Sequence, residues 1–152
     1  IAAFFLCYKE LVKQIEVTHQ HWEWLGAALC RHAHAKSAPS VIKLIFAWIG
    51  LVEYDKGAVI ITEGDRGDEM YAIYQGSVAV RRGDKAIATL GPGDLFGEVS
   101  LVAHVPRTAT VSATGTCQVF RISRRALNAI EEHFPELMVA ISRLARERVV
   151  LP

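Results

Sequence analysis

Two short segments carry the residues with the clearest capacity for chemistry, Gly97-Glu98 and, nine residues after the glutamate, Arg107-Thr108. Gly97 lets the backbone approach a ligand closely, and the N–H groups that follow it form an anion site at the start of a short helix. Arg107, fixed behind Pro106, can return to the same place and donate two hydrogen bonds to phosphate oxygens. These residue types at this spacing indicate recognition of an anion.

Glu98 narrows the class of anion. A carboxylate next to a phosphate site repels a polyanion, so Glu98 needs a partner other than the phosphate. A sugar hydroxyl is suitable, because it can donate a hydrogen bond to the carboxylate. One anion together with a pair of ribose-like hydroxyls indicates a nucleotide with a single phosphate charge. The alternative is that Glu98 and Arg107 form an ordinary ion pair on a surface loop, and the spacing alone leaves both interpretations open.

The segment from Leu51 to Ser123 must position these residues. Short runs rich in Val, Ile, Tyr and Phe alternate there with turn clusters at intervals of roughly 8–12 residues, which is typical of an all-β barrel or sandwich with hairpin connections. One stretch, Gly97 through Ala103, breaks this rhythm and is long enough for about two helical turns. The clusters are Asp55–Gly57, Glu63–Asp68, Gln75-Gly76, Arg82–Asp84 and Gly91–Asp94.

A glycine-poor leader precedes this β body, since nine of the eleven glycines lie after residue 52. Its apolar residues recur at helical spacing and predict an amphipathic helix. A second helix is expected from a cap at Ser40 to a stop at Gly50, apolar nearly all round and therefore buried. The stripe of the first helix consists of Leu11, Ile15, Trp22, Leu25 and Leu29.

Two further helices are predicted at the C-terminal end. Ser123 is a suitable N-cap for a helix whose apolar face includes Leu127, Ile130 and Phe134. Pro135 suits the first turn of the next helix. The apolar stripe of that last helix is Leu137, Ile141 and Leu144, extended by Leu151.

The segment Phe96–Val111 resembles the phosphate-binding cassette of cyclic nucleotide-binding domains, found in protein kinase A regulatory subunits, catabolite activator proteins and cyclic nucleotide-gated channels. The resemblance covers about residues 51–150 and includes Glu63–Tyr71, the turn at Gln75-Gly76 and Gly91–Gly97. It implies a mainly β fold with flanking α-helices, a β-roll or jelly-roll barrel at 51–123. A helical leader at 1–50 would precede the roll, and hinge and lid helices at 124–152 would follow it.

The resemblance also implies roles for single residues. Arg107 and the N–H groups around Val99 and Ser100 would hold the cyclic phosphate, and Glu98 would accept a hydrogen bond from the ribose 2′-OH. Val80 and Phe96 would line the base pocket. The full expected set of ligand-binding residues is Gly97, Glu98, Val99, Ser100, Arg107, Thr108, Ala109, Val80, Phe96, Arg143 and Arg146.

Thr108 and the last helix bear on which nucleotide is bound. Family members that prefer cGMP often carry threonine at the position of Thr108, but several cAMP-responsive members carry Ser or Thr there, so we expect cAMP ahead of cGMP.

In the family, the C-terminal helix, here Pro135–Val150, swings over the base. It has no aromatic residue to stack on a purine, so Arg143 or Arg146 is expected to lie over the base by a cation–π contact, with a solvated helix face as the alternative.

Composition and charge exclude several classes of protein. The 152 residues are 51% hydrophobic with a formal net charge of +1, which fits one globular domain and neither disorder nor bulk nucleic-acid binding. Cys7, Cys30 and Cys117 lie far apart, so we expect no disulfide framework and a reducing, cytoplasmic setting. No apolar run reaches the roughly 18 residues of a membrane-spanning helix. Residue 1 is Ile rather than Met, so we expect a fragment or a processed product. The cytosolic part of a larger protein is the alternative setting.

Three functions of different classes are weighed. The first is a regulatory sensor that binds cAMP or cGMP, with no other cofactor or metal, and signals through its helices to a second copy or a fused effector domain. The second is a domain of the same fold that binds no ligand and serves for docking or oligomerisation. The third is a metal-dependent β-barrel enzyme, which is disfavoured because residues 51–103 contain no histidine to line the barrel.

Overall fold

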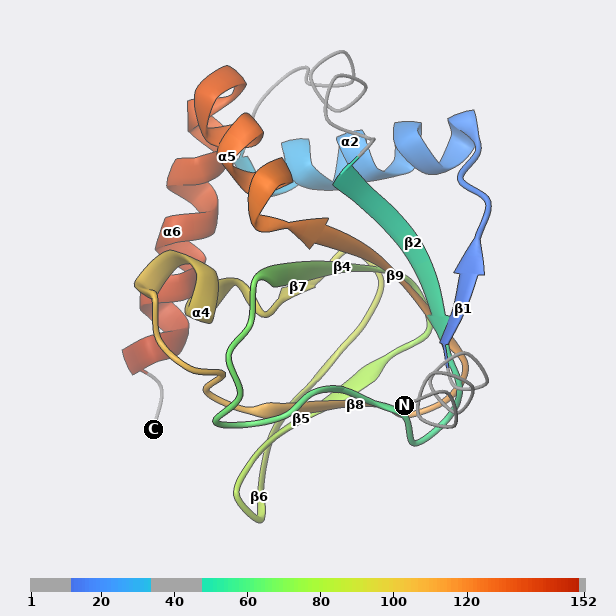
Figure 1. The fold of residues 1–152 in the computed structure, drawn as a ribbon, viewed down its shortest axis with the longest axis vertical. Coiled ribbons are helices and arrows are strands. Elements are labelled where there is room, and N and C mark those ends of the chain that lie inside the picture. Colours follow the sequence, from blue (N-terminus) through green and yellow to red (C-terminus); the bar gives the residue numbers. More distant parts are fainter. Residues whose placement is uncertain (1–11, 34–47, 151–152) are drawn as a thin grey trace, which may run out of the picture.

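The computed structural model describes residues 12–33 and 48–150, which form nine strands and four helices within those ranges (Figure 1). In chain order they are β1 (Val12–Ile15), α2 (His19–Ala33), β2 (Ile49–Tyr54), β3 (Val59–Ile61), β4 (Glu69–Gln75), β5 (Val78–Arg82), β6 (Lys85–Leu90), β7 (Leu95–Phe96), α4 (Glu98–Ala103), β8 (Thr110–Ala113), β9 (Cys117–Ser123), α5 (Arg124–His133) and α6 (Pro135–Val150).

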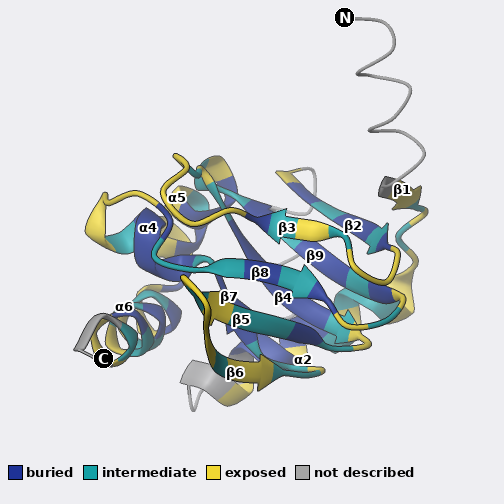
Figure 2. Ribbon diagram, turned by 90° about the horizontal axis from the view of Figure 1, so that it is seen from below, coloured by how far each residue is buried: buried dark blue, intermediate teal, exposed yellow. Residues whose placement is uncertain are grey.

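The strands form two antiparallel sheets that fold over each other as a roll. One has the order β1-β2-β9-β4-β7, and the other β3-β8-β5-β6. Buried side chains from both sheets, including Val52, Ile73, Val78 and Val119, pack into one cluster. In Figure 2 the central strands β4 and β9 are largely buried, whereas β3 and β6 at the edges carry exposed residues. The predicted β-roll is confirmed, and it is not a closed barrel.

A second cluster joins the five-stranded sheet to the helices. Strand β9 supplies both clusters, because successive side chains of a strand point to opposite faces: Val119 belongs to the first and Phe120 and Ile122 to the second. Trp24 of α2 stacks on Phe120 with ring centroids 6.0 Å apart. Helix α6 packs against α2, α4 and α5. It therefore connects the leader helix to the short helix α4.

The predicted helices of the roll and its C-terminal end are confirmed. Helix α4 occupies Glu98–Ala103. Ser123 caps α5, its Oγ accepting a hydrogen bond from the Ala126 N–H at 3.1 Å. Pro135 begins α6, whose buried face includes Leu137 and Ile141. No helix within the described ranges is long and apolar enough to cross a membrane.

Two expectations for the leader are wrong. Ile15, predicted on a helix, lies in β1 and pairs with Leu51 of β2, because pairing with the edge of β2 outweighs the local helical pattern. The helix predicted to end at Gly50 gives way to strand β2 from Ile49, and Trp48 is 37% exposed rather than buried. Extended backbone at Ile49 and Gly50 pairs with β9. The rest of that predicted helix lies outside the described residues.

Candidate functional site

Gly97 connects β7 to α4 through a left-handed turn. Its backbone has φ 82° and ψ −2°, a conformation that side chains with a Cβ rarely adopt. A Cβ atom at this position would lie 3.0 Å from Arg107 Nη1, 3.1 Å from Ile61 Cδ1 and 3.3 Å from the Glu69 carbonyl oxygen. The turn therefore brings the start of α4 against the Arg107 guanidinium, and only glycine allows both the angle and the approach.

Arg107 is a buried cation held by neutral acceptors. Its side chain donates from Nη1 to the Gly97 carbonyl at 2.9 Å and to Ser100 Oγ at 2.8 Å, and from Nη2 to the Glu69 carbonyl at 2.8 Å. The residue is 7% exposed. Burial lowers the pKa of the guanidinium. Across residues 12–33 and 48–150, no carboxylate lies within ion-pair distance of Arg107. An arginine buried in this way favours the binding of an anion.

The loop before β4 fixes the backbone of Arg107. The Arg107 N–H donates to the Asp65 carbonyl at 2.8 Å, and the Gly64 N–H donates to the Arg107 carbonyl at 2.8 Å. Gly67 lies directly against the guanidinium, where a Cβ atom would overlap it. The glycine-rich loop after Thr62 thus orients Arg107 toward α4 rather than toward solvent.

Glu98 is fully buried with one oxygen that lacks a partner. Its Oε1 accepts a hydrogen bond from Arg148 Nη1 at 2.7 Å, and the residue is 0% exposed. Its Oε2 is buried and accepts no hydrogen bond from the described residues. Burial raises the pKa of Glu98, and the Arg148 guanidinium opposes this rise. A buried carboxylate oxygen without a donor is costly, so Oε2 is an acceptor suited to a ligand hydroxyl.

The interpretation of Glu98 and Arg107 as a surface ion pair is therefore wrong. Both residues are buried, and Glu98 pairs with Arg148 of α6 instead. The Arg148 Nη1 also donates to the Leu95 carbonyl at 2.6 Å. These two acceptors hold the end of α6 against the start of α4.

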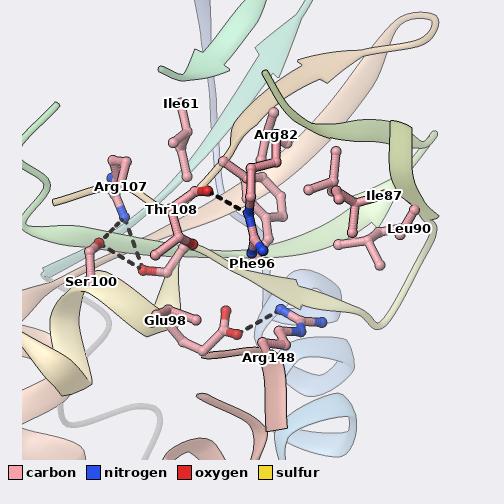
Figure 3. Close-up of a pocket in the computed structure, with 16 residues that line it drawn as sticks. Ile61, Arg82, Ile87, Leu90, Phe96, Glu98, Ser100, Arg107, Thr108 and Arg148 are labelled. Atoms are coloured by element: carbon pink, nitrogen blue, oxygen red, sulfur yellow. Dashed lines mark hydrogen bonds and ion pairs between the residues drawn. The ribbon is translucent and has the colours of Figure 1, made fainter. Parts of the chain in front are cut away.

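One pocket collects nine of the eleven expected site residues, which come from β5, β7, α4 and the segment before β8 (Figure 3). Arg143 and Arg146 do not line it: Arg143 is exposed, and Arg146 lines a separate shallow groove with Met138 and Val139. The complete lining is Ile61, Val80, Arg82, Ile87, Ala88, Leu90, Phe96, Gly97, Glu98, Val99, Ser100, Arg107, Thr108, Ala109, Val111 and Arg148.

Sequence reasoning missed two arginines of the pocket, Arg82 and Arg148. The signal for Arg148 is the spacing of the buried stripe Leu137, Ile141 and Ala145, which reaches position 148 after one further turn. The signal for Arg82 is its position two residues after Val80 on β5, since residues two apart on a strand share a face. Both positions follow from periodicity once the element that carries them is known.

A roll of two sheets that presents a buried arginine and a buried glutamate to one largely apolar pocket defines a class of small-ligand binding module. Comparison with known proteins identifies which one. Residues 51–133, more than half of the chain, match the cyclic nucleotide-binding domain. The chain belongs to this family, whose domains are regulatory modules.

The relatives are consistent with this assignment. The chain is 36% identical over 92 residues to a cAMP-dependent protein kinase regulatory subunit of Mycosarcoma maydis, an alignment that covers 58% of this chain and 17% of that subunit. A solved cyclic nucleotide-binding domain from Methylobacillus flagellatus has the same fold, with a TM-score of 0.75, 23% identity and coverage of 91% of this chain and 84% of that chain. The regulatory domain of Toxoplasma gondii PKA, crystallised with cAMP, gives a TM-score of 0.67 at 25% identity and covers 76% and 46%.

Proposed function

We propose that this chain is a sensor module that binds cAMP or cGMP at the pocket of Figure 3 and is not itself an enzyme. The observation that carries the proposal is the juxtaposition of two buried groups, the Arg107 guanidinium without a carboxylate partner among the described residues and Glu98 Oε2 without a donor. A cyclic nucleotide supplies what each group lacks, a single phosphate charge and a ribose hydroxyl. The cAMP in the crystals of the Toxoplasma gondii relative supports this choice of ligand.

The phosphate would bind between Arg107 and the first turn of α4. Arg107 Nη1 contacts the Gly97 carbonyl and Ser100 Oγ, so the guanidinium lies against the first turn of α4. The first N–H groups of a helix have no acceptor within the helix. A phosphate there would accept from these N–H groups and from the guanidinium together.

The ribose and base would follow along the same pocket. Glu98 Oε2 would accept from the 2′-OH, which satisfies the one buried side-chain atom that lacks a hydrogen bond within residues 12–33 and 48–150. Val80 and Phe96 offer an apolar wall for the purine. Thr108 lies at the edge of this wall and contributes a hydroxyl.

Arg148 supplies a route from the pocket to the helices. It belongs to α6, yet its guanidinium hydrogen-bonds to Glu98, the residue that would receive the ribose. Arg148 also lines the pocket, so a nucleotide that fills the pocket would displace this side chain and shift α6 between two arrangements. Such repacking would be the output of the sensor, and Arg143 or Arg146 would reach the base only in the rearranged state.

The partners and setting of the module are part of the same proposal. The aligned part of the chain is only a small fraction of the kinase regulatory subunit that it resembles, so a fused effector domain or a second copy would receive the signal through the helices. The proposed setting is the cytoplasm, or the cytosolic part of a larger protein.

Titration calorimetry with Arg107 variants tests the proposal. Arg107→Ala is expected to weaken cAMP and cGMP binding by roughly a hundredfold or more, because it removes the charge-assisted contacts to the phosphate. Arg107→Lys, which keeps the charge and loses the paired donors, should give an intermediate affinity. Arg66→Ala, at an exposed arginine of the neighbouring loop, is the control and should bind like the wild type. A folded Arg107→Ala variant with wild-type affinity would contradict the proposal.

A further inference from the structure

Arg82 is a second cation of the pocket, and strand alternation places it there. Along β5, Val78 is buried, Ala79, Val80 and Arg82 are half-buried, and Arg81 is exposed. Residues two apart on a strand share a face, so Arg82 lies on the same face as Val80, which lines the pocket. Figure 3 shows the Arg82 side chain reaching into the pocket between Thr108 and Ile87.

A hydrogen bond fixes the orientation of the Arg82 guanidinium. Its Nε donates to the Thr108 carbonyl at 3.1 Å. Because the guanidinium is planar, a bond from Nε restricts the direction in which the two terminal nitrogens point. Arg82 is therefore attached to the residue that follows Arg107, and it is held at a defined place in the pocket.

The other lining residues show which part of a nucleotide would meet Arg82. Arg107 and Ser100 lie together at one end of the pocket, joined by a 2.8 Å hydrogen bond, and they suit the phosphate. Ile87 and Leu90 of β6 line the opposite end, beyond Arg82 (Figure 3). Aliphatic side chains cannot hydrogen-bond a sugar or a phosphate, but they cover the faces of a purine. Arg82 therefore lies where the edge of the base would be.

The hydrogen-bonding character of a guanidinium decides which base fits this edge. Arginine is only a donor, with up to five N–H groups. Guanine presents two neighbouring acceptors, O6 and N7, which match the paired donors of arginine. Adenine presents N7 beside an amino group, and this amino group is a donor that faces the arginine unfavourably.

We infer that the Arg82 guanidinium hydrogen-bonds to O6 and N7 of the purine base and makes the site bind cGMP more tightly than cAMP. This inference rests on the proposed function. The preference for cGMP reverses the order expected from the sequence, which rested on Thr108. Thr108 adds a hydroxyl that can accept a hydrogen bond from the guanine 2-amino group. Inosine 3′,5′-cyclic monophosphate has the O6 of guanine and lacks the 2-amino group, so it reports on Arg82 without Thr108.

The experiment compares three nucleotides across matched variants. The affinities of cAMP, cGMP and cyclic IMP are measured by calorimetry for the wild type, Arg82→Ala, Arg82→Lys and Arg81→Ala. The wild type is expected to bind cGMP and cyclic IMP roughly tenfold or more tighter than cAMP, the scale of one paired arginine–guanine contact. Arg82→Ala should remove this preference, and Arg82→Lys should reduce it, because lysine lacks the paired donors. Arg81→Ala, at the exposed neighbour on the same strand, should leave the preference intact.

The affinity for cAMP separates base recognition from damage to the site. If Arg82 only supports Thr108, Arg82→Ala weakens cAMP and cyclic IMP by the same factor, and the inference is wrong. A wild-type domain that binds cAMP as tightly as cyclic IMP also overturns it, while the proposed function stands. A wild-type domain that binds none of the three nucleotides contradicts the proposed function, and the inference falls with it.

Discussion

Single residues of the site carry free-energy costs that a ligand would relieve. Glu98 is 0% exposed and leaves Oε2 without a hydrogen bond from the described residues. Arg107 is 7% exposed and makes its side-chain contacts with carbonyl and hydroxyl oxygens. Neither group contributes to the apolar core. Their burial supports the proposed function in binding, since a buried group of this kind is costly unless it is paired.

The raised pKa of Glu98 predicts a specific dependence of stability on pH. A carboxyl that binds its proton more tightly in the folded state stabilises the fold below its unfolded pKa of about 4.3, and this contribution is lost as pH rises toward the higher folded pKa. The stability of the wild type minus that of Glu98→Gln is therefore expected to fall as pH increases through this window. Urea unfolding at a series of pH values measures it.

The control for this comparison is Glu132→Gln, which changes an exposed glutamate of α5. The stability of the wild type minus that of Glu132→Gln should not fall in the same way as pH increases. A wild-type stability that rises with pH relative to Glu98→Gln would contradict the direction assigned to the pKa of Glu98.

Gly97→Ala is expected to destabilise the domain and weaken cyclic nucleotide binding. The left-handed backbone alone costs about 1 kcal/mol for alanine, and the added methyl group would press on Arg107. Gly57→Ala is the matched control, because Gly57 has φ +86° and open space at its Cβ position. Chemical unfolding and nucleotide titration are measured for both variants. If the two variants lose the same affinity, the contact with Arg107 has no role in binding.

At the scale of elements, α6 is the part of the fold that links the site to the rest of the chain. It packs against α2, α4 and α5 and reaches Glu98 through Arg148. Strands β5 and β7, helix α4 and the segment before β8 carry the proposed ligand-binding residues, and α6 adds Arg148 to the pocket. Under the proposed function, a ligand at Glu98 would therefore act on α6 and, through it, on the leader helix.

Arg148→Ala is expected to tighten nucleotide binding, because it removes a side chain that occupies part of the pocket and holds α6 against Glu98. A gain of roughly fivefold in affinity corresponds to about 1 kcal/mol, the usual net value of one hydrogen bond. Arg146→Ala is the control: Arg146 is exposed on the same helix and does not line the pocket. Weaker binding by Arg148→Ala would show that Arg148 supports the ligand rather than competes with it.

Much of the fold could be predicted from the sequence, because its patterns were local. Turn clusters separated the strands, Ser123 and Pro135 marked helix starts, and Gly97 marked the cassette turn. The strand at Val12–Ile15 could not be predicted, since its cause is the edge of β2, a partner distant in sequence. Arg148 was missed for a similar reason: its contact with Glu98 depends on how α6 packs against α4.

At the scale of the whole molecule, the core between the two sheets keeps solvent away from Cys117. This residue is 0% exposed, and burial raises its pKa to about 11. In a variant with Cys7→Ser and Cys30→Ser, a thiol reagent at pH 8 should react with Cys117 far more slowly in the folded domain than in denaturant, because the thiolate is rare and hidden. Similar rates in the two conditions would mean that the sheets do not enclose this residue.

The central claim is that Arg107 and Glu98 together form a cyclic nucleotide site, and calorimetric titration of the wild-type domain tests it most directly. The structure predicts saturable binding of one cGMP or cAMP per chain, with little or no binding of 5′-AMP, whose phosphate carries an additional charge and is not closed into a ring. Saturable binding would also raise the melting temperature of the domain, by an amount that grows with the logarithm of the ligand excess over Kd. Absence of heat and of a melting shift with both cyclic nucleotides would contradict the claim.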